Sequence, residues 1–298
     1  TLEKWYSLPI FIMKKIETLI PDIYNLFKDG KGCKLSDEQT GEIISRCVDN
    51  IYEEINKAVT GESEQVKRLR LSNVGYPDRQ LWYSCSDTKS EPLKDADPIK
   101  FLYGHLIEEL VLCLSELAGH TVTDRQKETT LGGVKGHIDA KVDGVLVDVK
   151  SASHFSFKKF KDKSLYSDDP FGYIDQLSSY STAEEADRSG FLVMNKTSGE
   201  LTFMELEELE RPDTTERINY LKSMIKSKTL PPRCYPDVPD GKSGNYRLGT
   251  NCFYCRYKHT CWSDANGGEG LRAFEYQKGI VYLTRVAKEP NVNEKVIS

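Results

Sequence analysis

The chain has 298 residues, enough for one large domain or for a main domain with one or two attachments. Hydrophobic residues make up 38% of it and charged residues 29%, which is typical of a soluble globular protein, and no apolar run reaches the roughly 18 to 20 residues of a membrane span. The net charge of -5 gives no overall attraction to nucleic acid, although it leaves room for local basic patches. Because the N-terminus mixes Lys and Glu with its apolar residues, unlike a signal peptide, we expect a cytoplasmic protein.

The first 70 residues are expected to form a helical N-terminal lobe. Apolar residues recur at helical spacing over 10–27 and again over 40–59, and glycines followed by an N-cap signal separate the two segments. Basic residues and a Leu-Trp-Tyr cluster come next, and a polar loop over 85–98 follows them. We place the end of the lobe at residue 70.

Residues 71–230 are expected to form an α/β core. The patterns predict helices over 99–119, 171–186 and 214–228, and a hairpin over 190–206. The first helix carries one apolar side, made of Leu102, Leu106, Leu110, Leu114 and Leu117. The order is therefore helix, strands, helix, strands, helix.

The first predicted strand pair, over 136–153, carries two acids in otherwise apolar surroundings. Asp143 and Gly144 form the strongest short hairpin signal, and a two-residue loop there puts Asp139 opposite Asp148. Directly opposed side chains lie about 5 Å apart, so the two like charges repel unless a cation neutralises them. The hairpin therefore predicts a cation site.

Strand alternation puts Lys150 on the same face as Asp148. Carboxylates are hard ligands that suit Mg²⁺ or Mn²⁺, and Mg²⁺ in proteins commonly also binds phosphate oxygens, so phosphate chemistry is favoured. The alternative is an exposed hairpin edge with solvated acids.

Residues 231–298 are expected to be a cysteine-cluster segment with a mobile tail over the last dozen residues. Cys252, Cys255 and Cys261, with Cys234 upstream, lie among Pro and Gly with few periodic apolar positions. A metal could supply the folding energy that a hydrophobic core does not. Four thiolates suit structural Zn²⁺ or an iron-sulfur cluster, and four unrelated buried thiols are the alternative.

Four short motifs, in the expected order, resemble those of PD-(D/E)XK nucleases. They are Gly104-x-x-x-Glu108, similar to the lambda-exonuclease type; Gly136-x-x-Asp139 and Asp148-x-Lys150, similar to the superfamily signature; and Gln176-x-x-x-Tyr180, similar to the RecB-like type. The resemblance spans about residues 75 to 205. It implies a mixed central sheet flanked by helices and a Mg²⁺- or Mn²⁺-dependent nuclease.

The resemblance also implies roles for individual residues. One or two Mg²⁺ ions would be bound by Glu108, Asp139, Asp148 and the carbonyl of Val149, while Lys150 would position or activate the attacking water, and Gln176 and Tyr180 would face DNA. RecB-like members often carry His in place of Glu108, and Glu109 lies beside it. Motif spacing favours Glu108, and the choice between the two stays open.

The cysteine run that begins at Cys252 resembles the iron-sulfur staple of AddB-type helicase-nucleases and of CRISPR adaptation nucleases. Those relatives take their fourth cysteine from upstream of the core, where this chain has Tyr76. Cys234 would have to substitute, or Cys85. The resemblance implies a [4Fe-4S] cluster, with structural Zn²⁺ as the alternative.

A nuclease also needs local cations to hold a polyanion. Arg79 precedes the core, and residues 151–163 contain Lys158 and Lys159 among aromatic side chains, as a stacking and phosphate-binding surface would. The aromatic residues are Phe155, Phe157 and Phe160. Ser151 could bond a phosphate, and a solvated charged loop is the alternative.

The expected function is a DNA exonuclease of recombination, repair or phage DNA processing, in a bacterium or a phage-infected cell. Its partner would be linear duplex or single-stranded DNA, with a recombination or single-strand-binding protein as a further candidate. The chain has no G-x4-GK[ST] phosphate loop, so any ATP-driven partner would be a separate protein. The alternatives are a non-catalytic nucleic-acid-binding module and a structure-specific or RNA-directed nuclease.

Overall fold

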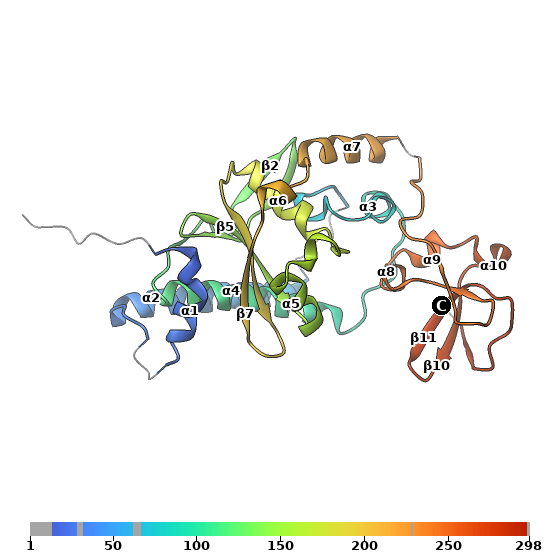
Figure 1. Cartoon of the computed structure of the whole chain (residues 1–298), viewed down its shortest axis with the longest axis horizontal. Helices are drawn as coiled ribbons and strands as arrows, with labels where there is room; N and C mark the ends of the chain where they lie inside the picture. The colour runs from blue at the N-terminus through green and yellow to red at the C-terminus, as the bar shows by residue number, and fades with distance from the viewer. Residues whose placement is uncertain (1–13, 29–31, 62–66, 228, 297–298) are drawn as a thin grey trace, which may run out of the picture.

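The computed structural model describes residues 14–28, 32–61, 67–227 and 229–296, and a five-stranded mixed sheet forms the centre of its core (Figure 1). The strand order is β1-β4-β5-β6-β7; β5 and β6 are parallel, and the other neighbouring pairs are antiparallel. The strands are β1 (Val122–Thr123), β4 (Ala140–Val142), β5 (Val145–Ala152), β6 (Ser189–Asn195) and β7 (Leu201–Glu205). Helices flank the sheet, which confirms the expected fold class.

Alternation along β5 divides the core into two apolar layers. The odd-numbered valines of β5 belong to the layer that α4 and α1 cover, while Leu146 and Ala152 belong to the layer under α5 and α6. These helices are α1 (Leu19–Asn25), α4 (Asp97–Leu117), α5 (His154–Lys161) and α6 (Tyr173–Ala183). Asp148 and Lys150 therefore share the face of α5 and α6.

The turn between β4 and β5 has the predicted geometry. Asp143 and Gly144 have positive φ angles of 50° and 81°, as a type I′ two-residue loop requires. Val142 pairs with Val145, so the predicted register is confirmed, and the ladder ends at Ala140.

Helix α4 packs on two sides. Ile107 lies in the layer against the sheet, and another side contacts α2 (Asp37–Thr60), where Asn50 Nδ2 donates to Glu109 Oε2 at 2.9 Å. Leu110 is 43% exposed. Leu114 packs against the sheet layer, so the expected leucine side is only partly buried, because two packing partners, the sheet and α2, decide which residues of α4 are buried.

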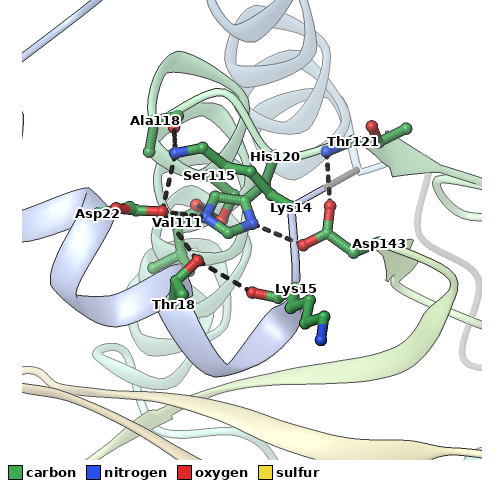
Figure 2. Close-up of polar contacts among 10 residues, drawn as sticks. All are labelled: Lys14, Lys15, Thr18, Asp22, Val111, Ser115, Ala118, His120, Thr121 and Asp143. Carbon is green, nitrogen blue, oxygen red and sulfur yellow. Dashed lines mark hydrogen bonds and ion pairs between the residues drawn. The ribbon is translucent and has the colours of Figure 1, made fainter. Parts of the chain in front are cut away.

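A buried histidine fastens the N-terminal helices to the core (Figure 2). His120 Nδ1 lies 2.6 Å from Asp143 Oδ2, and its Nε2 lies 3.1 Å from Asp22 Oδ2 in α1. Lys14 Nζ lies 2.8 Å from the same Asp22 oxygen. Ile16 is buried in the same apolar layer as α1. The N-terminal helices thus share a core layer with the sheet.

The other predicted elements can be compared directly. The helices expected over 40–59, 99–119, 171–186 and 214–228 are confirmed as α2, α4, α6 and α7, and the later hairpin is confirmed as β6 and β7. Part of the helix expected over 10–27 lies outside the described residues. The further elements of the first 230 residues are η1 (Ile16–Thr18), η2 (Leu71–Asn73), α3 (Asp78–Cys85), β2 (Glu128–Leu131), β3 (Val134–His137), η3 (Ser164–Tyr166), η4 (Glu208–Glu210) and α7 (Thr214–Lys226). None of the helices in the described ranges has the length and apolar character needed to cross a bilayer.

The C-terminal segment has a sheet and an apolar cluster of its own. Its strands, in the order β12-β10-β11-β9-β8, are β8 (Val238–Pro239), β9 (Tyr246–Arg247), β10 (Arg272–Tyr276), β11 (Gly279–Arg285) and β12 (Glu294–Lys295). Its helices are α8 (Thr250–Phe253), α9 (Lys258–Cys261) and α10 (Ala265–Gly268). Leu248, Trp262 and Leu271 are buried together. The expectation that no hydrophobic core holds this segment is therefore wrong. Within the expected tail β12 pairs with β10, and the mobility of the tail stays a prediction.

Candidate active site

Glu108, Asp139, Asp148 and Lys150 lie close enough together for their charges to interact. Glu108 belongs to α4, Asp139 immediately precedes β4, and the other two lie on β5. Burial, together with repulsion from Glu109 and Asp148, raises the pKa of Glu108 to about 7. The pKa of Asp139 is raised well above its usual range, first by burial and then by repulsion from Asp148 and Glu108. The four predicted residues thus interact as one cluster.

Lys150 neutralises part of this cluster. Its ammonium lies 2.5 Å from Asp148 Oδ2 and 3.4 Å from Gln176 Oε1. Burial lowers the pKa of Lys150, but the charges of Asp148 and Asp139 outweigh burial and raise it. Lys150 is therefore a cation at neutral pH, suited to stabilising negative charge rather than to accepting a proton.

Backbone and amide groups orient the two aspartates. The Val149 amide donates to Asp139 Oδ2 at 2.7 Å, and Gln176 Nε2 donates to Asp148 Oδ1 at 3.2 Å. Burial raises the pKa of Asp148, and Lys150 opposes that shift. Asp148 Oδ2 is buried and accepts no hydrogen bond from the described residues. Among the described residues, the Lys150 ammonium is therefore the group that neutralises this oxygen.

The geometry separates Glu108 from Glu109. Glu109 Oε2 accepts from Arg125 Nη1 at 3.1 Å and from Asn50 at 2.9 Å, so its carboxylate is paired on the α2 side of the helix. Glu108, about 100° further around α4, is the one whose pKa responds to Asp148. Of the two candidates, Glu108 is the one that belongs to the cluster.

Gln126 is a site residue that the sequence did not reveal. Its Nε2 donates to Glu108 Oε1 at 2.6 Å, and its backbone amide donates to the Asp139 carbonyl at 3.0 Å. Its φ of 49° lies in the left-handed region, which is uncommon for a residue with a side chain and is often found at functional sites. No motif marks Gln126, because only the folded chain brings it to Glu108.

Tyr180, expected from the sequence to face DNA, is buried near the acid cluster, where burial and then the charges of Asp148 and Asp139 raise its pKa. Its side chain is 3% exposed and belongs to the apolar layer under α6. A Cβ at Gly136 would lie 2.7 Å from Tyr180 Cε1, so the glycine makes room for this ring. Gln176, one turn earlier, contacts Asp148 and Lys150 instead.

Of the three rings in the expected stacking surface after β5, one is exposed, and a role of this surface in binding DNA stays a prediction. Residues 154–161 form α5, whose inner face buries Phe157 and Phe160, while Phe155 is 71% exposed. Lys158 is exposed, and Lys159 Nζ lies 2.6 Å from Asp168 Oδ2. Helical period, rather than an open loop, decides which side chains reach solvent.

Ser151 and Arg79 lie in different places. Ser151 is half-buried on β5, and a Cβ at Gly104 would lie 4.0 Å from its Oγ, so it is next to α4. Arg79 lies on α3, its Nε donates to Tyr83 Oη at 3.3 Å, and it lines a pocket among the cysteines. The roles of both in binding DNA stay predictions.

The four predicted cysteines line one small pocket of about 30 Å³, and Cys85 does not line it. The pKa of Cys252 is raised to about 11, first by burial and then by the neighbouring thiols Cys255 and Cys261. Among the described residues, no three His, Cys, Asp or Glu side chains are arranged as ligands of a metal ion. The cysteine staple and the carboxylate metal site both remain predictions.

A larger cavity, of about 530 Å³, lies between α3, α7 and residues 231–235. Glu108, Asp139, Asp148 and Lys150 are not among the residues that line it. The cavity is thus separate from the acid cluster.

No protein-family model and no curated protein matches the chain. Among solved structures, it is similar to SSO0001, with 16% identity and a TM-score of 0.39 over 69% of this chain and 92% of that one. It is also similar to LHK-Exo, an alkaline exonuclease from Laribacter hongkongensis, with 12% identity and a TM-score of 0.32 over 52% of this chain and 90% of that one. The structure of LHK-Exo in complex with dAMP has 14% identity and a TM-score of 0.37, over 55% of this chain and 92% of that one. All three TM-scores are below 0.5, so we infer the function from this chain's own residues.

Proposed function

We propose that this protein is a Mg²⁺-dependent DNA nuclease, an exonuclease of recombination, repair or phage DNA processing. The observation that carries the proposal is the cluster of Glu108, Asp139, Asp148 and Lys150 on a buried strand and its neighbours. The charge of Asp148 opposes the ionisation of Glu108 and Asp139, and carboxylates placed in this way are groups that a divalent cation stabilises. The Val149 carbonyl would add a fourth oxygen.

The donor set fits Mg²⁺ chemically. All the donors are hard oxygens, and Asp148 Oδ2 is buried without a hydrogen-bond partner among the described residues. Lys150 now neutralises that oxygen, so Mg²⁺ would compete with its ammonium. Bound Mg²⁺ would supply Lewis-acid activation of a water and stabilise charge on the phosphate.

The protein groups would perform the remaining tasks. Lys150, as a cation, would stabilise negative charge that develops on the scissile phosphate. Gln176 would hold the Asp148 carboxylate and the Lys150 ammonium at their present spacing, since it contacts both. The Val149 amide would fix the orientation of Asp139.

The test is the degradation of linear and circular DNA, duplex and single-stranded, with Mg²⁺, Mn²⁺ or EDTA. We expect metal-dependent release of acid-soluble nucleotides from linear substrates only, abolished in Asp148→Asn and Lys150→Ala. Lys278→Ala is the control, because its side chain is exposed in the turn between β10 and β11, away from the cluster. Cutting of circles would indicate an endonuclease, and cutting of RNA alone an RNA-directed enzyme. Binding without turnover on any substrate would sink the nuclease proposal in favour of a binding module.

We further propose that Cys234, Cys252, Cys255 and Cys261 hold a [4Fe-4S] cluster or Zn²⁺. Their common pocket supports the proposal. Metal analysis and visible absorbance of anaerobically purified protein should give about four irons or one zinc per chain, lost in Cys252→Ser and kept in Cys33→Ser. Cys33 is exposed and lies outside the pocket. A wild-type protein that is fully folded and contains no metal would refute the proposed cysteine staple.

A further inference from the structure

An exposed aromatic ring is connected to the acid cluster by direct contacts. Phe171 is 56% exposed and stacks on Tyr173, with ring centroids 5.5 Å apart and planes at 29°. The Tyr173 ring lies 4.9 Å from Lys150 Nζ, which lies 2.5 Å from Asp148. Two side chains therefore separate a solvent-exposed ring from the proposed catalytic carboxylate.

The turn that carries Phe171 is held tightly. Gly172 has a φ of 69°, and a Cβ built on it would lie 2.2 Å from the backbone of Gly75. Asp169 Oδ2 accepts from the Ile174 amide at 2.8 Å across the turn. The ring is thus presented in a fixed position, so little conformational entropy is lost when a partner packs on it.

A second exposed ring, Phe155 on α5, is linked through Lys159 to Asp168, in the loop that carries Phe171. Phe155 is 71% exposed, and Lys159 Nζ lies 5.6 Å from its ring centroid. Lys159 is also paired with Asp168, which precedes Phe171 by three residues, at 2.6 Å. Because Asp168 neutralises Lys159, Phe155 and Phe171 present apolar ring faces with little positive charge next to them. Such a surface suits bases better than phosphates.

We infer that Phe171 stacks on unpaired bases, with Phe155 as a second exposed ring, and that the substrate of this protein is single-stranded DNA. The inference rests on the proposed nuclease function, because the stacked rings lead to Lys150 and Asp148. In a duplex both faces of an internal base are already stacked on neighbours, whereas a single strand has free base faces. Stacking of a base on an aromatic side chain tolerates any sequence.

The test is binding of a labelled single-stranded DNA oligonucleotide, measured by fluorescence anisotropy in EDTA so that nothing is cleaved. Phe171→Ala should weaken binding by about 5- to 150-fold, which corresponds to the loss of one stacked base. Phe171→Trp should bind as wild type does, with its indole fluorescence quenched by the DNA. Binding of a relaxed, covalently closed circular duplex should change by less than about twofold, since its paired and stacked bases offer no free face.

Phe27→Ala is the matched control, because Phe27 is 71% exposed and lies after α1 rather than at the site. Unchanged single-strand binding by Phe171→Ala, or an equal loss with duplex, overturns the inference. A larger loss with RNA than with DNA overturns it as well. If wild type digests DNA but Phe171→Ala binds normally, the nuclease proposal stands alone. If wild type digests nothing yet needs Phe171 to bind single strands, stacking stands and the nuclease proposal fails.

Discussion

At the residue scale, burial gives the acid cluster its chemistry. Glu108, Asp139 and Asp148 all have raised pKa values, with burial as the largest cause in each. A carboxylate that is costly to ionise in the metal-free chain gains most from a bound cation. The same burial links the stability of the chain to pH.

We expect the metal-free protein to lose stability as the pH rises. The pKa of Glu108 is raised from 4.5 to about 7, so the stability it contributes is fully present below pH 4.5 and is lost as the pH rises through 7. The difference between the ordinary and the raised pKa of Glu108 corresponds to about 3 kcal/mol of unfolding free energy. Glu108→Gln should therefore be more stable than wild type at pH 8, by up to that amount, in urea denaturation with EDTA.

The control for this experiment is Glu269→Gln, since Glu269 is exposed on the C-terminal segment. Its stability should follow that of wild type at each pH. A wild-type protein equally stable at pH 4 and pH 8 would contradict the role assigned to buried carboxylates.

Gln126 is expected to act through Glu108. Gln126→Leu removes the 2.6 Å hydrogen bond to the Glu108 carboxylate, and loss of such a partner of a metal ligand typically lowers metal affinity by about 10- to 100-fold. Mn²⁺ binding followed by electron paramagnetic resonance measures this directly. Gln277→Leu, in the exposed turn between β10 and β11, should bind Mn²⁺ as wild type does. Equal affinities for both variants would mean that Gln126 only packs.

At the element scale, each helix is defined by what it packs against. Helix α5 begins at the Ser153 N-cap, whose hydroxyl accepts from the Ser156 amide, and its period of 3.6 buries Phe157 and Phe160 while Phe155 stays outside. Helix α1 buries Leu19 and Ile23 against the opposite face of the sheet and is held in addition by the polar contacts around His120 (Figure 2). Apolar packing thus holds helices on both faces of the sheet, and the polar cluster around His120 adds to it on the face of α1.

His120→Ala should loosen residues 14–25 more than the rest of the chain. The substitution leaves the Asp22 and Asp143 carboxylates without their shared imidazole, and an unsatisfied buried polar group costs about 1 to 3 kcal/mol. Hydrogen exchange should show faster exchange in α1 than in β5. His105→Ala, with an exposed side chain on α4, is the control. Uniform exchange changes across both elements would argue against a local fastening.

At the scale of the whole molecule, the C-terminal sheet lies at one end and α2 at the other (Figure 1). The polar loop over 85–98 is where the C-terminal segment attaches. Arg256 Nε donates to the Glu91 carbonyl at 2.9 Å, and the Glu91 amide donates to the Arg256 carbonyl at 2.9 Å. The Lys258 ammonium, 7% exposed, is paired with the Glu91 carboxylate.

Glu91→Gln should weaken this attachment. It leaves the buried Lys258 ammonium without a counter-charge, and breaking a buried pair in this way costs about 3 to 5 kcal/mol. Limited proteolysis should then release the C-terminal segment faster than in wild type. Glu207→Gln, whose partner Lys163 is exposed, should be cut at the wild-type rate. Resistance equal to wild type would show that the pair of Glu91 and Lys258 does not hold the segment.

The sequence by itself determined the features that depend on near neighbours. The Asp143–Gly144 turn, the register of β4 and β5, and the shared face of Asp148 and Lys150 follow from a two-residue loop and a period of two. Most helix positions follow from the apolar period of 3.6. These patterns act over a few residues, so they can be read without the fold.

Only the tertiary structure decided what depends on contacts between distant segments. It selected Glu108 over Glu109 by pairing the latter with Arg125, and it buried Tyr180 under α6. It also brought Gln126 to the cluster and left Phe171 exposed beside it. Burial and electrostatic partners are properties of the packed chain, because they depend on which surfaces meet when the sheet and its helices assemble.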